Sequence, residues 1–192
     1  HMTHWQHPRF FAYFPANAAP ASMLAEQVAN AMAAQAMLWQ TAPAATELEQ
    51  VMVAWLGDAL GLGPRFSGTI HDSATTATLA AVLTMRETAL GWEGNARGLA
   101  GLGRLRIYAS AEGHSSIDKA VRIAGIGQDN LVRIPAGPDH AMDPGALGAA
   151  IAGDRAAGHL PAGVVLCAGG TSIGAFDRIG ESLAVARAAG LR

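Results

Sequence analysis

Hydrophobic and polar positions alternate along the second part of the chain in a repeating strand–helix order. Apolar runs predict strands at 105–109, 130–134 and 163–168, and helical periods predict helices at 117–126, 144–157 and 179–189. Ser115 is the predicted cap of the first of these helices, and Asp143, followed by Pro144, is the predicted N-cap of the second. The third run is continuously apolar, which is typical of a strand buried on both faces. This order predicts a mainly parallel sheet with flanking helices and right-handed crossovers.

The earlier part of the chain reads as helices separated by proline-rich segments. Residues 21–39 are rich in Ala and Met and apolar around much of the circumference, which indicates a helix buried on more than one side and suggests a subunit interface. A capping box at Thr46 and Glu49, after an extended approach at Pro43, predicts a second helix that runs to Leu60.

The stretch from residue 67 to 79 organises the remaining pattern. A short β-prone piece, Thr69 and Ile70, leads through a turn into a helix expected over 73–90, whose inward side carries Leu79, Val82, Leu83 and Met85. A helix start with small hydroxylic residues offers unpaired N–H groups and partial positive charge to a phosphate. The plainer alternative is that Ser73 or Asp72 only caps the helix. Residues 91–104 are Gly-rich and are expected to form a surface loop.

Composition narrows the classes of function. The chain has 192 residues, 51% of them hydrophobic, which suffices for one α/β domain with a sizeable core. A net charge of −2 and scattered basic residues argue against a nucleic-acid partner, and no apolar run reaches the length of a membrane span. Cys167 is the single cysteine, which fits a reducing cytoplasm.

Two further turns carry residues suited to chemistry. His114 follows the strand at 105–109 and Thr171 follows the strand at 163–168, and ligands of parallel sheets bind beyond such carboxyl ends. A lone histidine is more often structural than functional. His114 becomes a candidate functional residue only because three such turns are expected at the same edge of the sheet. The histidines lack metal-ligand spacing, and no G-x-S-x-G, Walker A or G-x-G-x-x-G motif occurs.

Residues 3–20 are aromatic and interrupted by prolines, so an extended segment is expected there. Its aromatic side chains could pack on the chain's own core, on a partner subunit or around a flat ligand. A phosphate seat, a stacking histidine and an aromatic environment together fit pyridoxal 5'-phosphate (PLP).

With these motifs in order, the chain resembles the group II PLP-dependent amino-acid decarboxylases, the aromatic-L-amino-acid decarboxylase family. The likeness is carried by five segments along nearly the whole chain: 3–15, 43–49 (resembling S-P-A-x-T-E-L-E), the phosphate loop 72–79, the histidine turn 113–116 (resembling A-H-S-S) and the turn 170–177 (resembling G-T-T…F-D). The resemblance implies a fold-type-I PLP-dependent transferase-like large domain, incomplete in this chain. It implies an N-terminal extended segment and interface helices in residues 1–66, and the first part of the PLP-binding α/β large domain in residues 67–192.

The resemblance also implies roles for single residues. Ser73, Ala74 and Thr75 would bind the cofactor phosphate, and His114 would stack on the pyridine ring and manage protons as the catalytic residue. Thr171 would lie near the 3-oxygen of the ring. The substrate pocket would be walled by Tyr13, Phe14 and Pro15, with Met37 contributed across a dimer interface. Ala16 and Met37 depart from the residues common in the family, which weakens the expectation of an aromatic substrate.

Two family elements have no counterpart. The H-V-D-A-A strand, whose aspartate holds the pyridinium nitrogen, and the Schiff-base lysine are not matched; Lys119, the only lysine, reads as a solvated helix face. The expectation is therefore that this chain is inactive alone. The complete enzyme, with the remaining C-terminal polypeptide and as a homodimer, would decarboxylate an L-amino acid.

Two alternatives stay open. One is another lyase or transaminase-like reaction on the same cofactor fold. The other is a non-catalytic fragment that binds PLP or phosphate, or that docks a partner through its apolar helices. The absence of a matching lysine is the feature that distinguishes this second alternative.

Overall fold

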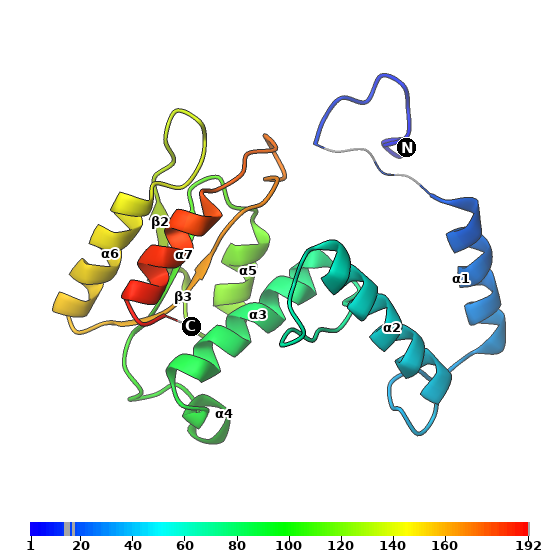
Figure 1. Ribbon diagram of the computed structural model, residues 1–192, viewed down its shortest axis with the longest axis horizontal. Coiled ribbons are helices and arrows are strands. Elements are labelled where there is room, and N and C mark those ends of the chain that lie inside the picture. Colours follow the sequence, from blue (N-terminus) through cyan, green and yellow to red (C-terminus); the bar gives the residue numbers. More distant parts are fainter. Residues whose placement is uncertain (14–15, 17, 192) are drawn as a thin grey trace. The chain divides into compact units, whose positions relative to one another are not determined.

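The computed structural model describes residues 1–13, 16 and 18–191 (Figure 1). The chain divides into two compact units, residues 1–72 and residues 73–192. The predicted start of a PLP-binding domain at residue 67 stays a prediction. Among the described residues, none of the helices is long and apolar enough to cross a lipid bilayer.

A three-stranded parallel sheet forms the centre of the second unit. Its strands are β1 (Leu105–Ser110), β2 (Leu131–Ile134) and β3 (Leu160–Val165), in the order β2-β1-β3. The parallel sheet is as predicted, but the third strand begins and ends three residues earlier than the apolar run indicated. Backbone pairing with β1 sets the bounds of β3. The pairing begins at Leu160 and ends at Val165, and the N–H of Cys167 donates to Asp177 instead of to a strand.

One face of the sheet is covered by α3 (Ala74–Ala89) and α5 (Ser116–Ile123). Side chains from both helices and from β1 form a common core, in which Leu79, Val82, Leu83 and Met85 of α3 take the inward positions predicted for them. Gly163 of β3 allows this close packing, because a Cβ there would lie 2.5 Å from the sulfur of Met85. The loop predicted at 91–104 contains one short helix, α4 (Glu93–Arg97).

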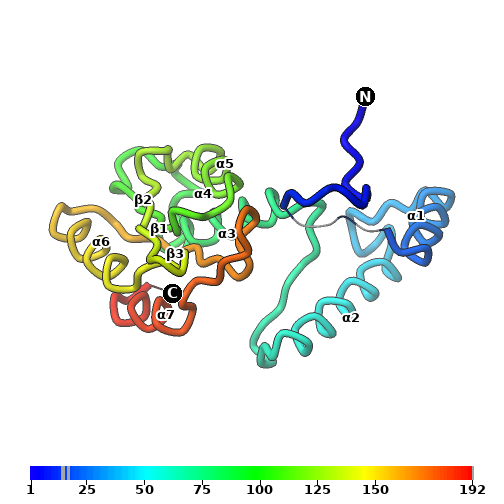
Figure 2. Tube along the Cα trace, turned by 90° about the horizontal axis from the view of Figure 1, so that it is seen from above, coloured from blue at the N-terminus to red at the C-terminus, as the bar shows by residue number. Residues whose placement is uncertain are grey.

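The opposite face is covered by α6 (Pro144–Ala156) and α7 (Ile179–Ala188). Figure 2 shows α5 and α7 on opposite sides of the three strands. The N-cap prediction for α6 is confirmed, since the Asp143 carboxylate accepts hydrogen bonds from the N–H groups of Gly145 and Ala146. A 3-10 turn, η1 (Gln128–Asn130), leads into β2. The unit is thus a three-layer α/β fold.

The first unit contains α1 (Pro20–Met32) and α2 (Pro43–Ala59). The prediction of one helix over 21–39 is wrong in its second half, because Ala33 adopts a left-handed conformation that ends α1. The helix is also not buried on more than one side as expected, because no residue of α1 is buried within the part of the chain that the structure describes. The proposed subunit interface stays a prediction.

The capping-box prediction at Thr46 and Glu49 is wrong. Proline is favoured at the first helical position, and α2 accordingly begins at Pro43, so Thr46 lies inside the helix. Glu49 instead accepts hydrogen bonds from the Thr69 hydroxyl and the Ile70 N–H, both at 2.7 Å. Residues 69 and 70 form no strand; the α2 carboxylate takes the place of a strand partner.

Candidate functional site

The start of α3 presents two backbone donors for which the described part of the chain offers no partner. Ser73 is the N-cap, and its hydroxyl accepts a hydrogen bond from the Thr76 N–H at 3.3 Å, so the capping alternative holds for this residue. Among the described residues, the N–H groups of Ala74 and Thr75 and the hydroxyl of Thr75 have no hydrogen-bond partner. Two free N–H groups at the positive end of a 16-residue helix are suited to an oxyanion.

The turn between β1 and α5 carries His114. Its Nδ1 accepts a hydrogen bond from the N–H of Ser116 at 3.2 Å, and its carbonyl accepts one from Ile117 at 3.1 Å. The imidazole therefore acts as the cap of α5, whereas the predicted cap residue Ser115 makes no side-chain cap bond. Because Nδ1 accepts, the proton of the neutral ring resides on Nε2.

A side-chain contact links these two elements. The hydroxyls of Thr78, one turn into α3, and of Ser116, at the start of α5, lie 3.3 Å apart. Ser116 is buried, whereas the His114 ring is exposed. The helix start and the histidine turn are thus joined at one edge of the unit.

Thr171 lies in the loop that follows β3. The loop closes on itself through hydrogen bonds from the N–H groups of Gly169 and Gly170 to the carbonyl of Ala175. The hydroxyl of Thr171 has no hydrogen-bond partner among the described residues. The loops after β2 and β3 leave the same end of the sheet in Figure 1, and parallel pairing places the end of β1 there as well.

Asp177 fixes this loop, a role that sequence reasoning missed. Its buried carboxylate accepts the N–H of Cys167 at 2.7 Å through one oxygen and the N–H of Met142 at 2.8 Å through the other. The carboxylate thereby joins the segments that follow β2 and β3. The only available signal was the position of Asp177 in the F-D end of the turn motif.

Cys167 lies two residues after the end of β3 and is partly buried. Burial raises the pKa of its thiol, and the negative charge of Asp177 adds to this effect. A hydrogen bond from the His114 backbone lowers the pKa and so acts in the opposite direction. The raised pKa favours the neutral thiol of Cys167.

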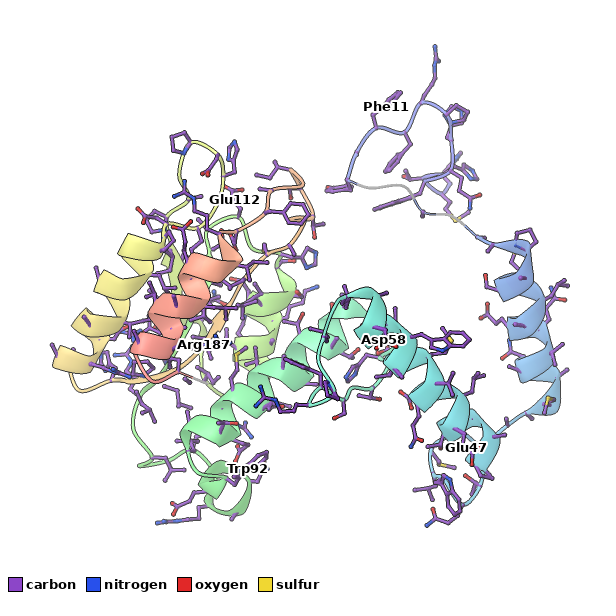
Figure 3. All side chains as sticks on the ribbon, viewed as in Figure 1. Phe11, Glu47, Asp58, Trp92, Glu112 and Arg187 are labelled. Atoms are coloured by element: carbon purple, nitrogen blue, oxygen red, sulfur yellow. The ribbon has the colours of Figure 1, made fainter. Side chains whose placement is uncertain are left out.

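The described substrate-pocket candidates, Tyr13 and Met37, belong to the first unit; Figure 3 draws the described side chains on the ribbon. Tyr13 is exposed and stacks on Trp5 with ring centroids 5.7 Å apart, and Met37 is 72% exposed. Phe14 and Pro15 lie outside the described residues. The substrate pocket stays a prediction.

Sequence comparison identifies the family. Residues 1–191 match the model of the pyridoxal-dependent decarboxylase conserved domain. Tryptophan decarboxylase 1 of Oryza sativa subsp. japonica is 36% identical over 96% of this chain and 38% of its own length. The aromatic-L-amino-acid decarboxylase of Sus scrofa is 38% identical over 94% of this chain and 39% of its own length. The chain spans about two fifths of the length of these relatives.

Solved structures agree with the sequence matches. The crystal structure of Oryza sativa TDC with PLP and tryptamine superposes with a TM-score of 0.90 at 35% identity, covering 99% of this chain and 40% of that one. Mouse CSAD superposes with the same TM-score at 25% identity over 97% of this chain and 38% of that one. The expected PLP-decarboxylase fold and its incompleteness in this chain are confirmed. The chain belongs to the pyridoxal-dependent decarboxylase family.

Proposed function

We propose that the complete protein uses PLP to decarboxylate an L-amino acid, aromatic side chains favoured, to the amine and CO₂. This chain would supply the phosphate seat and the ring-stacking histidine, but not the Schiff-base lysine. The observation that carries the proposal is the pair of N–H groups at Ala74 and Thr75 that no described residue accepts, on a helix joined to the His114 turn by the Thr78–Ser116 contact.

The start of α3 fits the phosphate of the cofactor. The donors of Ala74 and Thr75 and the hydroxyl of Thr75 supply hydrogen bonds, and the helix dipole supplies favourable charge. Alanine and threonine side chains are small, so an anion can approach the backbone closely. Ser73 would contribute mainly by holding the first turn of α3 in place.

His114 is suited to lie against a flat ring. The Ser116 N–H fixes its Nδ1, which holds the orientation of the exposed imidazole and leaves Nε2 to donate a proton. When bound, the cofactor supplies an electron sink for the charge that develops at the substrate α-carbon. His114 would orient the ring and handle the proton at that carbon.

Thr171 would donate its hydroxyl on the 3-oxygen side of the ring. Its loop is held by Asp177, so the hydroxyl is presented from a fixed backbone. Tyr13, Phe14 and Pro15 would wall the substrate, with Met37 from a second subunit. The aspartate for the pyridinium nitrogen and the Schiff-base lysine would come from the remaining polypeptide of a cytoplasmic homodimer.

The test uses the complete protein loaded with PLP. L-tryptophan, L-tyrosine and L-phenylalanine are supplied, and CO₂ and amine are measured. Aldehyde is recorded as well, because one relative is named phenylacetaldehyde synthase. His114→Ala should abolish turnover while PLP still binds, and His159→Ala, just before β3, serves as the matched control. Full turnover in His114→Ala would refute the assigned role.

A partner-docking fragment is the second candidate. It is favoured by the large apolar side chains that α1 and α2 expose, among them Leu24, Met32, Trp55 and Leu56. Under this alternative the complete protein binds PLP or a partner without releasing CO₂ from any amino acid. The same assay therefore separates the two candidates.

A further inference from the structure

Arg133 of β2 lies against the histidine turn. Its Nη1 donates a hydrogen bond to the carbonyl of Ser110 at 2.8 Å, at the point where β1 ends. Its Nη2 forms an ion pair with the carboxylate of Asp118 in the first turn of α5. One guanidinium thus connects the two elements between which His114 is held.

The same carbonyl also closes the turn. Ser110 accepts a hydrogen bond from the N–H of Gly113 at 3.0 Å, so Arg133 and the turn backbone share one acceptor. The other oxygen of Asp118 accepts a hydrogen bond from Gln128 at 2.7 Å, which fixes the carboxylate toward the start of β2. The side chains of Arg133 and Asp118 are 30% and 21% exposed, so solvent screens the pair only in part.

Gly113 shows how closely Arg133 approaches. A Cβ at this position would lie 2.8 Å from Nη1 of Arg133 and 3.0 Å from the carbonyl oxygen of Ser110. The A-H-S-S motif of the family has alanine here, whereas this chain has glycine. The glycine leaves the space that the guanidinium occupies.

We propose that Arg133, paired with Asp118, is a positioning residue that sets the orientation of His114. The inference rests on the proposed function, because it assumes that the His114 ring stacks on the cofactor. A planar guanidinium can bond Ser110 and Asp118 at once, whereas a lysine ammonium cannot reproduce this fork. Loss of the fork frees the turn without removing any group that touches cofactor or substrate.

The test compares Arg133→Lys with Arg178→Lys in the complete PLP-loaded protein. Arg178 also pairs with an aspartate, Asp139, but this pair is half exposed and lies away from the histidine turn in sequence. Arg133→Lys should lower kcat about tenfold with little change in KM, since a small misplacement of a catalytic group costs rate rather than binding. Arg178→Lys should leave both constants unchanged.

Two further readouts separate positioning from loss of structure. The visible circular dichroism of bound PLP should change in Arg133→Lys at unchanged PLP content, and amide exchange in residues 113–117 should speed up. Gly113→Ala should impair the protein with Arg133 present and impair it less in an Arg133→Ser background. Additive effects of the two substitutions would overturn the proposal.

The outcomes also distinguish this inference from the proposed function. If His114→Ala loses turnover while Arg133→Lys keeps wild-type kcat, circular dichroism and exchange, only the positioning role is refuted. If His114→Ala keeps full turnover, the role of the histidine itself is refuted, and the positioning role with it.

Discussion

Replacing Asp177 by asparagine should loosen the loop that carries Thr171. The buried carboxylate accepts two backbone N–H groups, from Met142 and Cys167, and asparagine keeps the shape but offers only one oxygen. Hydrogen bonds to a charged group contribute about 1.5–3 kcal/mol each, and about half of that remains when the acceptor is neutral. Losing one bond and half of the other amounts to about 3 kcal/mol.

Amide hydrogen exchange of the complete protein measures this loss locally. A cost of about 3 kcal/mol should speed exchange in peptides containing Met142 and Cys167 roughly hundredfold, provided that exchange follows local opening. Asp139→Asn is the matched control: it removes the charge of an exposed ion pair with Arg178, whereas the asparagine oxygen can still accept the Ala141 N–H, so these peptides should stay unchanged.

The reasoning is refuted if Asp177→Asn exchanges as slowly as the unchanged protein at both amides. It is also refuted if Asp139→Asn has an equal effect, because the result would then depend on loop charge rather than on the buried hydrogen bonds.

Three further substitutions have defined outcomes. Ser73→Ala removes the N-cap of α3 and should cost about 1 kcal/mol, seen as a lower midpoint of thermal unfolding and weaker PLP binding. Tyr108→Phe removes the hydrogen bond from a fully buried hydroxyl to Asp154 and should cost about 1.5–3 kcal/mol; an unchanged midpoint would contradict it. Hydrogen bonds from the Ile70 N–H and, to a smaller extent, the Thr69 hydroxyl lower the pKa of Glu49. The ionised Glu49 carboxylate should therefore hold residues 69 and 70 in place at neutral pH. That support is lost as pH falls from about 4.3, the ordinary glutamate value, through the lowered one. Glu49→Gln should abolish this pH dependence of amide exchange at Ile70.

Local patterns predicted the elements whose boundaries are set within a few residues. Asp143 was predicted as the N-cap of α6, and Ser73 was one of two candidate caps of α3; both side chains accept N–H groups of the first helical turn. The parallel sheet and the placement of His114 and Thr171 after strands followed from the strand–helix order. These features depend on neighbours along the chain, which the sequence states directly.

Predictions failed where a partner distant in sequence competes for the same group. Glu49 satisfied the spacing of a capping box, yet it bonds Ile70, which is 21 residues away. The cap of α5 was missed for a local reason instead: Ser115 has the spacing of a helix cap, yet the ring of its neighbour His114 takes that place. The third strand was placed too late because its register is set by β1 rather than by its own apolar run.

The sequence by itself determined the family motifs, the alternation of strands and helices, and the residues available for a phosphate seat and a stacking histidine. Only the tertiary structure decided what holds these residues in place. Asp177 bonds the segments after β2 and β3, Arg133 bonds the end of β1 at the histidine turn, and the Thr78 hydroxyl contacts that of Ser116. The physical reason is that a carboxylate, guanidinium or hydroxyl can bond many donors or acceptors, and the fold alone selects which of them come within reach.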